Sequence, residues 1–116
     1  MSTIKEYAES IKEQVEFSAF INLKYYEEYE QDLMSEEEYI NEAQKISTNL
    51  LMQVYKISGL YYDIGEVQKA ENHFNKAKSY DETLLPSPAD FKNLIITLIR
   101  ENVESIDDVL QKFFQE

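Results

Sequence analysis

Few side chains in this sequence are suited to catalysis. The chain of 116 residues contains one histidine, His73, and no cysteine. Zinc sites are built largely from cysteine and histidine, and Ser–His–Asp and Cys–His mechanisms need a histidine base. Lys69 and Ala77 stand four residues either side of His73, and Ala70 stands three before it, so no second metal ligand has helical spacing. We expect His73 to be a structural residue, facing solvent or partly buried.

Carboxylates are abundant, but their spacing does not predict a metal site. Glu27, Glu28, Glu30 and Asp32 could attract a cation, yet adjacent acids on a helix point in different directions. The EF-hand pattern and a glycine-rich phosphate loop are both absent from a chain with two glycines. The sequence therefore predicts a protein that is not an enzyme, without catalytic residues, metal ligands or cofactors.

The negative charge is concentrated near the beginning of the chain. The formal net charge is -12, and the first 42 positions carry twelve acidic residues against three lysines, a net charge of -9. Such a field repels nucleic-acid phosphates and attracts basic surfaces. We expect no direct nucleic-acid binding. A basic protein partner and a merely solubilising acidic surface both stay open.

The composition indicates one folded domain over residues 1–116. Hydrophobic residues make up 43% of the chain and aromatic residues 13%, too many for a disordered segment. No apolar run approaches the length of about 18 residues that indicates a membrane span. The first residues have no basic flank before an apolar stretch, which predicts no signal peptide. A cytoplasmic location is the resulting expectation.

Helix start signals recur along the chain, which has only two glycines and two prolines. Thr3, Ser35 and Ser105 each precede a carboxylate by three residues, and Ser87 is followed by Pro88 and then Asp90. The sequence predicts an all-α fold class, a compact five-helix domain of antiparallel helical hairpins. The predicted helices span about 3–32, 36–64, 66–80, 88–101 and 106–115.

Apolar residues spaced three or four apart predict the buried face of each helix. The predicted stripes are Ile4, Ala8, Ile11, Val15 and Ala19, then Ala43, Ile46, Leu50, Val54, Ile57 and Tyr61, then Val67, Ala70, Phe74 and Ala77. Phe17, Phe20 and Ile21 add a second apolar face, so we expect contacts on two sides there. The helix over 88–101 is apolar over most of its circumference, which places it at the centre of the core. Gly65 is expected to end the second helix.

The second and third predicted helices carry a spaced motif. Its positions are Val54-x2-Ile57-Ser58-x2-Tyr61, Gly65 at the turn, Ala70-x3-Phe74 and Ala77. The motif resembles a single degenerate tetratricopeptide repeat over roughly residues 51–84. Val54 replaces the usual tryptophan, Ser58 the usual glycine, and Glu82 stands near the expected proline. A generic antiparallel helix pair is the alternative.

The resemblance implies peptide or protein binding on the surface lined by the first helix of the repeat. On this sequence that surface would contain Met52, Tyr55, Lys56, Gly59, Tyr62 and Asp63. The corresponding function is a non-catalytic protein–protein interaction module, acting as an adaptor, chaperone-like subunit or regulatory subunit. Tyrosine and methionine are suitable contact residues because they offer large contact areas.

A second functional hypothesis rests on the acidic, tyrosine-rich segment at 23–32. It contains Tyr25, Tyr26, Glu27, Glu28, Tyr29, Glu30 and Asp32. Tyrosines can anchor a partner and carboxylates can steer a basic one, as in small acidic inhibitors of nucleases and DNA-binding proteins. The alternative function is therefore an acidic inhibitor, immunity-type or DNA-mimic protein that binds a basic nucleic-acid-binding protein. An ordinary helix end, with the tyrosines facing inward, is the alternative for this segment. A homodimer that covers surplus apolar surface also stays open.

Overall fold

Four long α-helices make up the part of the chain that the structure describes. The computed structural model describes residues 3–81 and 87–114. Its helices are α1 (Thr3–Glu30), α2 (Glu36–Asp63), α3 (Val67–Asp81) and α4 (Pro88–Phe114). The described residues contain no strand, which confirms the predicted all-α class. None of these helices has both the length and the apolarity needed to cross a membrane.

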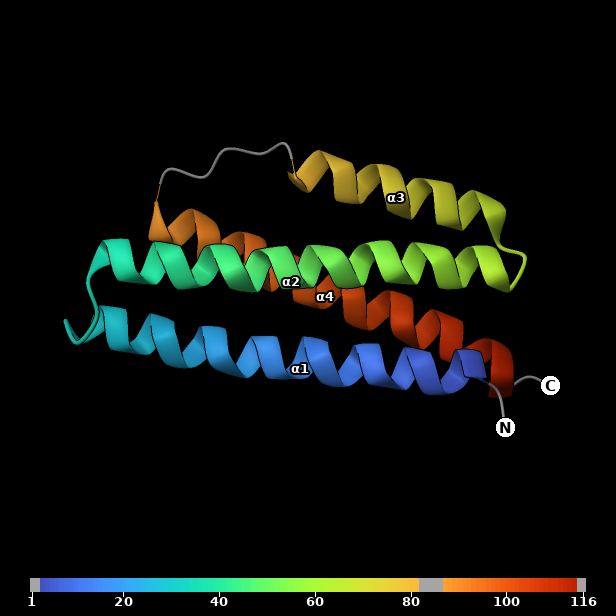
Figure 1. Ribbon diagram of the computed structural model, residues 1–116, viewed down its shortest axis with the longest axis horizontal. Helices are drawn as coiled ribbons and strands as arrows, with labels where there is room; N and C mark the ends of the chain where they lie inside the picture. The colour runs from blue at the N-terminus through green and yellow to red at the C-terminus, as the bar shows by residue number, and fades with distance from the viewer. Residues whose placement is uncertain (1–2, 82–86, 115–116) are drawn as a thin grey trace.

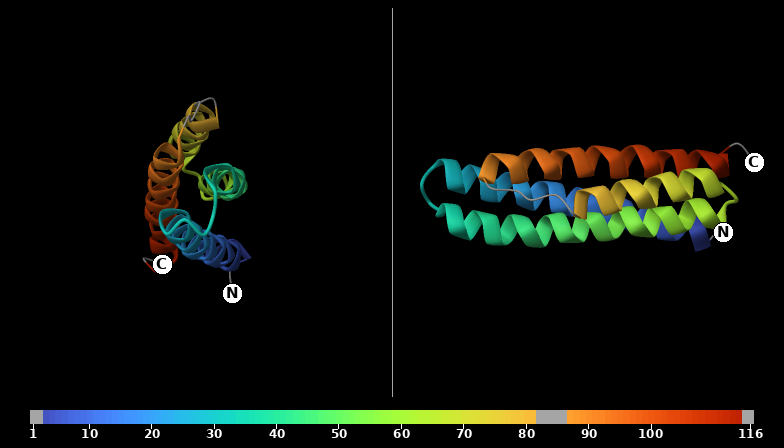
Figure 2. Two further views of the ribbon diagram at one scale, coloured as in Figure 1. Left: turned by 90° about the vertical axis from the view of Figure 1, so that its left-hand side faces the viewer. Right: turned by 90° about the horizontal axis from the view of Figure 1, so that it is seen from above.

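Helix α2 lies between α1 and α3 and runs antiparallel to both (Figure 1). Helix α4 passes obliquely behind α2 and reaches α1, and the end-on view places α1 and α3 at opposite edges (Figures 1 and 2). The Cα atoms extend over 51 × 27 × 16 Å, an elongated bundle. Helix α2 is the one that packs against each of the other three, so it forms the centre of the bundle.

The expectation that the helix over 88–101 lies at the centre is wrong. Helix α2 buries twelve side chains, whereas Ile96 of α4 is 47% exposed. The more apolar helix is not the central one, because α2 buries polar side chains as well as apolar ones, among them Gln53 and Ser58. In the sequence these polar residues made α2 look like a helix with one solvent-exposed face, although the folded chain buries them.

The predicted helices over 88–101 and 106–115 are a single helix, so the five-helix prediction is wrong for the described residues. Buried positions keep a spacing of three or four residues across the junction, through Leu98, Asn102 and Ile106. Asn102 is fully buried and donates from Nδ2 to the Leu50 carbonyl at 3.3 Å. A polar residue within a buried stripe interrupts the apolar pattern but not the helix. Residue 115 lies outside the described part of the chain.

The ends of α2 follow the predicted signals. At its start, the Glu38 N–H donates to Ser35 Oγ at 3.1 Å, the expected N-cap. At its end, Gly65 has a φ of 85°, and the Glu66 N–H reaches back to the Tyr61 carbonyl at 2.8 Å. This pattern is a Schellman motif, in which glycine adopts the left-handed conformation without steric cost.

Helix α1 ends two residues before the predicted boundary at residue 32. Asp32 has a φ of 59°, and the Leu33 N–H donates to the Glu28 carbonyl at 2.9 Å. The termination is again a Schellman motif, with aspartate in the position where glycine is usual. Without a glycine, the sequence did not mark this boundary.

The buried face of α1 changes from apolar to polar along its length. Ala8, Ile11 and Val15 are buried as predicted, but the face continues through Ser18 and Asn22. The hydroxyl of Tyr39 donates to Asn22 Oδ1 and Asn49 Nδ2 donates to Ser18 Oγ, each at 2.9 Å. Of the second apolar face predicted from Phe17, Phe20 and Ile21, Ile21 packs against the core, whereas Phe17 and Phe20 are 62% and 68% exposed, so the prediction is wrong for the two phenylalanines.

Replacing Ser105 distinguishes one continuous helix from two. At a true N-cap, Ser→Ala costs about 1 kcal/mol, whereas within a helix alanine is the more favourable residue. We expect Ser105→Ala to leave the urea-unfolding free energy unchanged or slightly raised. Ser87→Ala should lower it by about 1 kcal/mol, because Ser87 Oγ accepts from the Asp90 N–H at 3.3 Å. Equal losses in both variants would contradict a continuous α4.

Candidate functional site

A hollow in the described surface lies between α2 and α3. Its volume is about 560 Å³. We call it the α2–α3 groove, and its lining residues are Tyr55, Ser58, Gly59 and Tyr62 of α2 with Ala70, Glu71, Phe74 and Asn75 of α3. Three of the eight lining residues are aromatic, and Glu71 is the only charged one.

Small residues let the two helices approach, and aromatic residues form the walls. Ser58 Oγ donates to the Ala70 carbonyl at 2.7 Å, which joins the helices at the floor of the groove. The rings of Tyr55 and Phe74 meet edge to face, with centroids 5.3 Å apart. Tyr62 is 65% exposed and Phe74 is 45% exposed. The arrangement offers an apolar ligand group two accessible aromatic faces.

The structure brings together only part of the surface predicted from the repeat-like motif. Tyr55 and Tyr62 both line the α2–α3 groove. Met52 lines a smaller adjoining hollow of about 240 Å³, which shares Tyr55 with the groove. Lys56 and Asp63 are not among the residues lining either hollow. Lys56 is half-buried and Asp63 is exposed.

Helix α3 supplies the wall that sequence reasoning missed. The buried face of α3 contains Ala70, His73 and Ala77, whereas Val67 and Phe74 are each 45% exposed. The buried face therefore differs from the predicted stripe of Val67, Ala70, Phe74 and Ala77, because the helix is turned so that His73 faces inward and Phe74 does not. Counting histidine as a core residue at the spacing Ala70-x2-His73-x3-Ala77 would have placed Phe74 at the edge.

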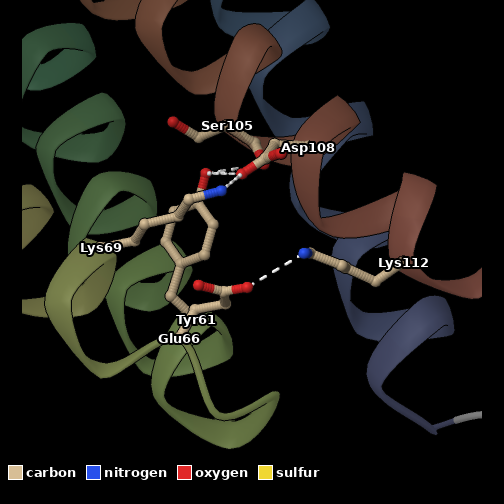
Figure 3. Close-up of polar contacts among 6 residues, drawn as sticks. All are labelled: Tyr61, Glu66, Lys69, Ser105, Asp108 and Lys112. Carbon is tan, nitrogen blue, oxygen red and sulfur yellow. Dashed lines mark hydrogen bonds and ion pairs between the residues drawn. The ribbon is translucent and has the colours of Figure 1, made fainter.

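A polar network fixes the α2–α3 hairpin to α4 (Figure 3). The hydroxyl of Tyr61 donates to Asp108 Oδ2 at 3.0 Å, and Lys69 Nζ lies 2.9 Å from the same oxygen. Lys112 of α4 also pairs with Glu66, which precedes α3, at 2.9 Å. The network matters because α3 and α4 are bridged by long side chains rather than by close backbone contact.

Protonation states in this network follow from burial and pairing. Burial raises the pKa of Tyr61 to about 12, so the hydroxyl keeps its proton and remains a donor. The hydrogen bond from Lys69 lowers the pKa of Asp108, so its carboxylate stays ionised. The hydrogen bonds that Tyr61 and Lys69 donate to Asp108 Oδ2 are both charge-assisted, because the accepting carboxylate is ionised.

Removing the Tyr61 hydroxyl tests this network. We expect Tyr61→Phe to lower the unfolding free energy by about 1.5 kcal/mol or more, the range for a hydrogen bond to a charged group. Tyr62→Phe is the matched control, since Tyr62 is the next residue and is 65% exposed. Chemical denaturation measures both. The assignment fails if the two variants change stability equally.

His73 faces a second polar cluster between α3 and α4. Its side chain is 9% exposed and lies edge-on to the Tyr61 ring, with centroids 5.8 Å apart. Nearby, Glu101 Oε1 accepts from the Tyr80 hydroxyl at 2.7 Å and pairs with Lys76 at 2.8 Å. Burial lowers the pKa of His73; the Glu101 charge opposes this effect and Lys76 adds to it.

The pH dependence of stability should therefore contain a His73 contribution. A folded-state pKa below the usual 6.5 favours the neutral ring, so this contribution is complete above that pH and is lost as pH falls. Between about pH 7.5 and 5.5, we expect wild type to lose more stability than His73→Gln. Urea unfolding at each pH measures the difference, and other titrating groups cancel because both proteins share them. Parallel curves would contradict a buried neutral His73.

The tyrosines of the acidic segment face the interior of the bundle. Tyr25, Tyr26 and Tyr29 are all half-buried. The Tyr26 and Tyr29 rings lie 5.4 and 5.6 Å from the fully buried ring of Tyr39. Lys92 of α4 covers the Tyr26 ring at 4.1 Å. These side chains join three helices at one end of the bundle.

The carboxylates of the same segment mostly face solvent. Glu27, Glu30 and Asp32 are exposed, whereas Glu28 is half-buried. Asp32 also terminates α1 through its positive φ. The predicted acidic interface is thus divided, with its aromatic groups packed inward and its charges outward.

The fold is a four-helix arrangement with an aromatic groove, and no cluster of histidine or acidic residues in the described chain could hold a metal ion. Protein families, curated proteins and solved structures provide no match to the chain. Functional inference therefore rests on the groove and the surface.

Proposed function

We propose that this chain is a non-catalytic protein–protein interaction module that binds a peptide or protein partner in the α2–α3 groove. The observation that supports this most is the pairing of accessible aromatic walls with a floor of small residues. Tyr62 and Phe74 are 65% and 45% exposed beside Ser58 and Gly59. An apolar side chain seated there would bury both rings, and buried aromatic anchors dominate binding energies.

The antiparallel α2–α3 pair is compatible with the interpretation of residues 51–84 as a degenerate tetratricopeptide repeat, which stays part of this proposal. Ser58, in place of the glycine of the motif, approaches the α3 backbone closely, as its Oγ–Ala70 hydrogen bond of 2.7 Å requires. An adaptor, chaperone-like or regulatory role follows from such a surface. The cytoplasmic location remains a prediction from the sequence.

An acidic inhibitor of a basic nucleic-acid-binding protein is the second candidate. Exposed Glu27, Glu30 and Asp32 favour it, since they would steer a basic partner. The inward packing of Tyr26 and Tyr29 on Tyr39 removes the aromatic anchors from the interface expected there. The groove is therefore the better-supported site.

Peptide selection tests the groove directly. A phage-displayed random peptide library is panned against the purified chain, and enriched peptides are titrated calorimetrically. We expect peptides with an aromatic or aliphatic anchor, whose Kd rises at least about tenfold in the double variant Tyr62→Ala/Phe74→Ala. Because the groove has one charged lining residue, Kd should change less than about twofold between low and high salt.

The control variant keeps the groove and removes exposed aromatics elsewhere. Phe17→Ala/Phe20→Ala deletes two rings of similar exposure from α1 and should leave these affinities unchanged. Tyr55→Ala is a further groove variant, with some loss of stability because its ring packs on Phe74. Enriched peptides that bind the groove variant and wild type equally, or a library that yields no binders, would contradict the proposal.

A further inference from the structure

The outward side of α1 carries a continuous apolar surface. Phe17, Phe20 and Leu23 are 62%, 68% and 56% exposed. They stand three residues apart, so their side chains are neighbours on the helix surface. Helix α1 lies at an edge of the bundle, and no described helix covers its outer side (Figures 1 and 2). Single exposed apolar residues are ordinary, but a row of three large ones marks an interaction surface.

Glutamates border this row at both ends. Glu13, Glu16 and Glu27 are exposed and form no ion pair among the described residues. Lys24 is the one basic residue within a helical turn of Phe20 on α1. The first 42 positions, to which α1 belongs, carry a net charge of -9. Below, the α1 face means these three apolar residues with these three glutamates.

Beside the α1 face lies room for a partner's side chain. Phe17 forms part of the wall of a hollow of about 340 Å³ between α1 and α2. Ile21 and Ile46 also line it. The rest of its lining is mostly polar and includes the Lys45–Glu42 ion pair on α2. A side chain entering from the α1 face would therefore find a recess of mixed polarity as well as the exposed rings.

From these observations we infer that the α1 face docks a basic amphipathic helix of another protein. A ridge of residues spaced three apart packs into the grooves of a facing helix. The apolar stripe of that helix would cover Phe17, Phe20 and Leu23, and its flanking lysines or arginines would meet the glutamates. The inference is independent of the proposed peptide groove, which lies on α2 and α3.

Charge argues against a second copy of this chain as the occupant. In an antiparallel self-pairing centred on Phe20, Lys24 would face Glu16, but Glu13 would face Glu27 in both halves. Each copy also brings a net charge of -12. A basic helix replaces that repulsion with attraction at every acidic position.

A synthetic peptide provides the probe. It is a helix-forming peptide of about three heptads with leucine at the a and d positions and lysine at e and g. A second peptide has glutamate in place of every lysine. With isotope-labelled wild-type chain, we expect the basic peptide to shift the NMR signals of α1, with an affinity that falls as salt rises. The acidic peptide should not bind.

Two variants divide the α1 face into its parts. Both Phe17→Ala/Phe20→Ala and Glu13→Gln/Glu16→Gln/Glu27→Gln should raise Kd at least about tenfold. The matched control Glu36→Gln/Glu37→Gln/Glu38→Gln removes the same charge from exposed residues in the first turn of α2 and should change Kd less than about twofold. The substituted phenylalanines are exposed, so alanine should preserve the helix, which circular dichroism verifies.

The result could overturn the inference in three ways. Equal weakening by the α2 control would show unspecific attraction to acidic residues. Absence of binding, or signal shifts that leave α1 unaffected, would remove the docking surface. Sedimentation of wild type as a dimer that Phe20→Ala converts to monomer would assign the α1 face to self-association. The groove variant Tyr62→Ala/Phe74→Ala should bind the basic peptide as wild type does. If the α1 face fails to bind this peptide, the proposal that the α2–α3 groove binds a partner is therefore not affected.

Discussion

The packing of α2 against three helices is the constraint on which the rest of the structure depends. A helix buried on several sides cannot leave its polar side chains to water, so each needs a partner within the protein. Ser58 donates to the Ala70 carbonyl of α3, Asn49 donates from Nδ2 to Ser18 Oγ of α1, and Asn102 of α4 donates to the Leu50 carbonyl. Such bonds specify where α2 sits against its neighbours, which apolar packing alone would leave less defined.

Two tyrosines extend this constraint to the ends of α2. Tyr39 joins the beginning of α2 to Asn22 of α1, and burial raises its pKa to about 12. Tyr61 joins the other end to Asp108 of α4. Because α3 and α4 are linked mainly by long side chains, the Tyr61 network also holds the outer wall of the peptide groove. The site proposed for binding thus depends on contacts made on the opposite side of the hairpin.

The aromatic residues divide into those committed to the fold and those left at the surface. Tyr26 and Tyr29 pack on Tyr39, and the acidic segment therefore lacks free anchors. Exposed rings lie elsewhere, in the groove at the α3 edge, which has one charged lining residue, and on the acidic α1 face at the other edge (Figure 2). The bundle thereby presents two surfaces of different chemistry, separated by α2.

Local signals in the sequence were sufficient for the helical class, for the caps at Ser35 and Ser87, and for the end of α2 at Gly65, because these depend on neighbouring residues. The apolar stripe of α2 and the pairing of Tyr55 with Tyr62 also followed from helical spacing. Three features required the folded chain: the continuity of α4 through Asn102, the rotation of α3 toward His73, and the exposure of Phe17 and Phe20. In the first two, a polar side chain is buried because a distant helix supplies its surroundings; in the third, apolar side chains stay exposed because no described helix covers them. Periodicity can show that a helix has an apolar face, but only long-range packing decides which face is covered.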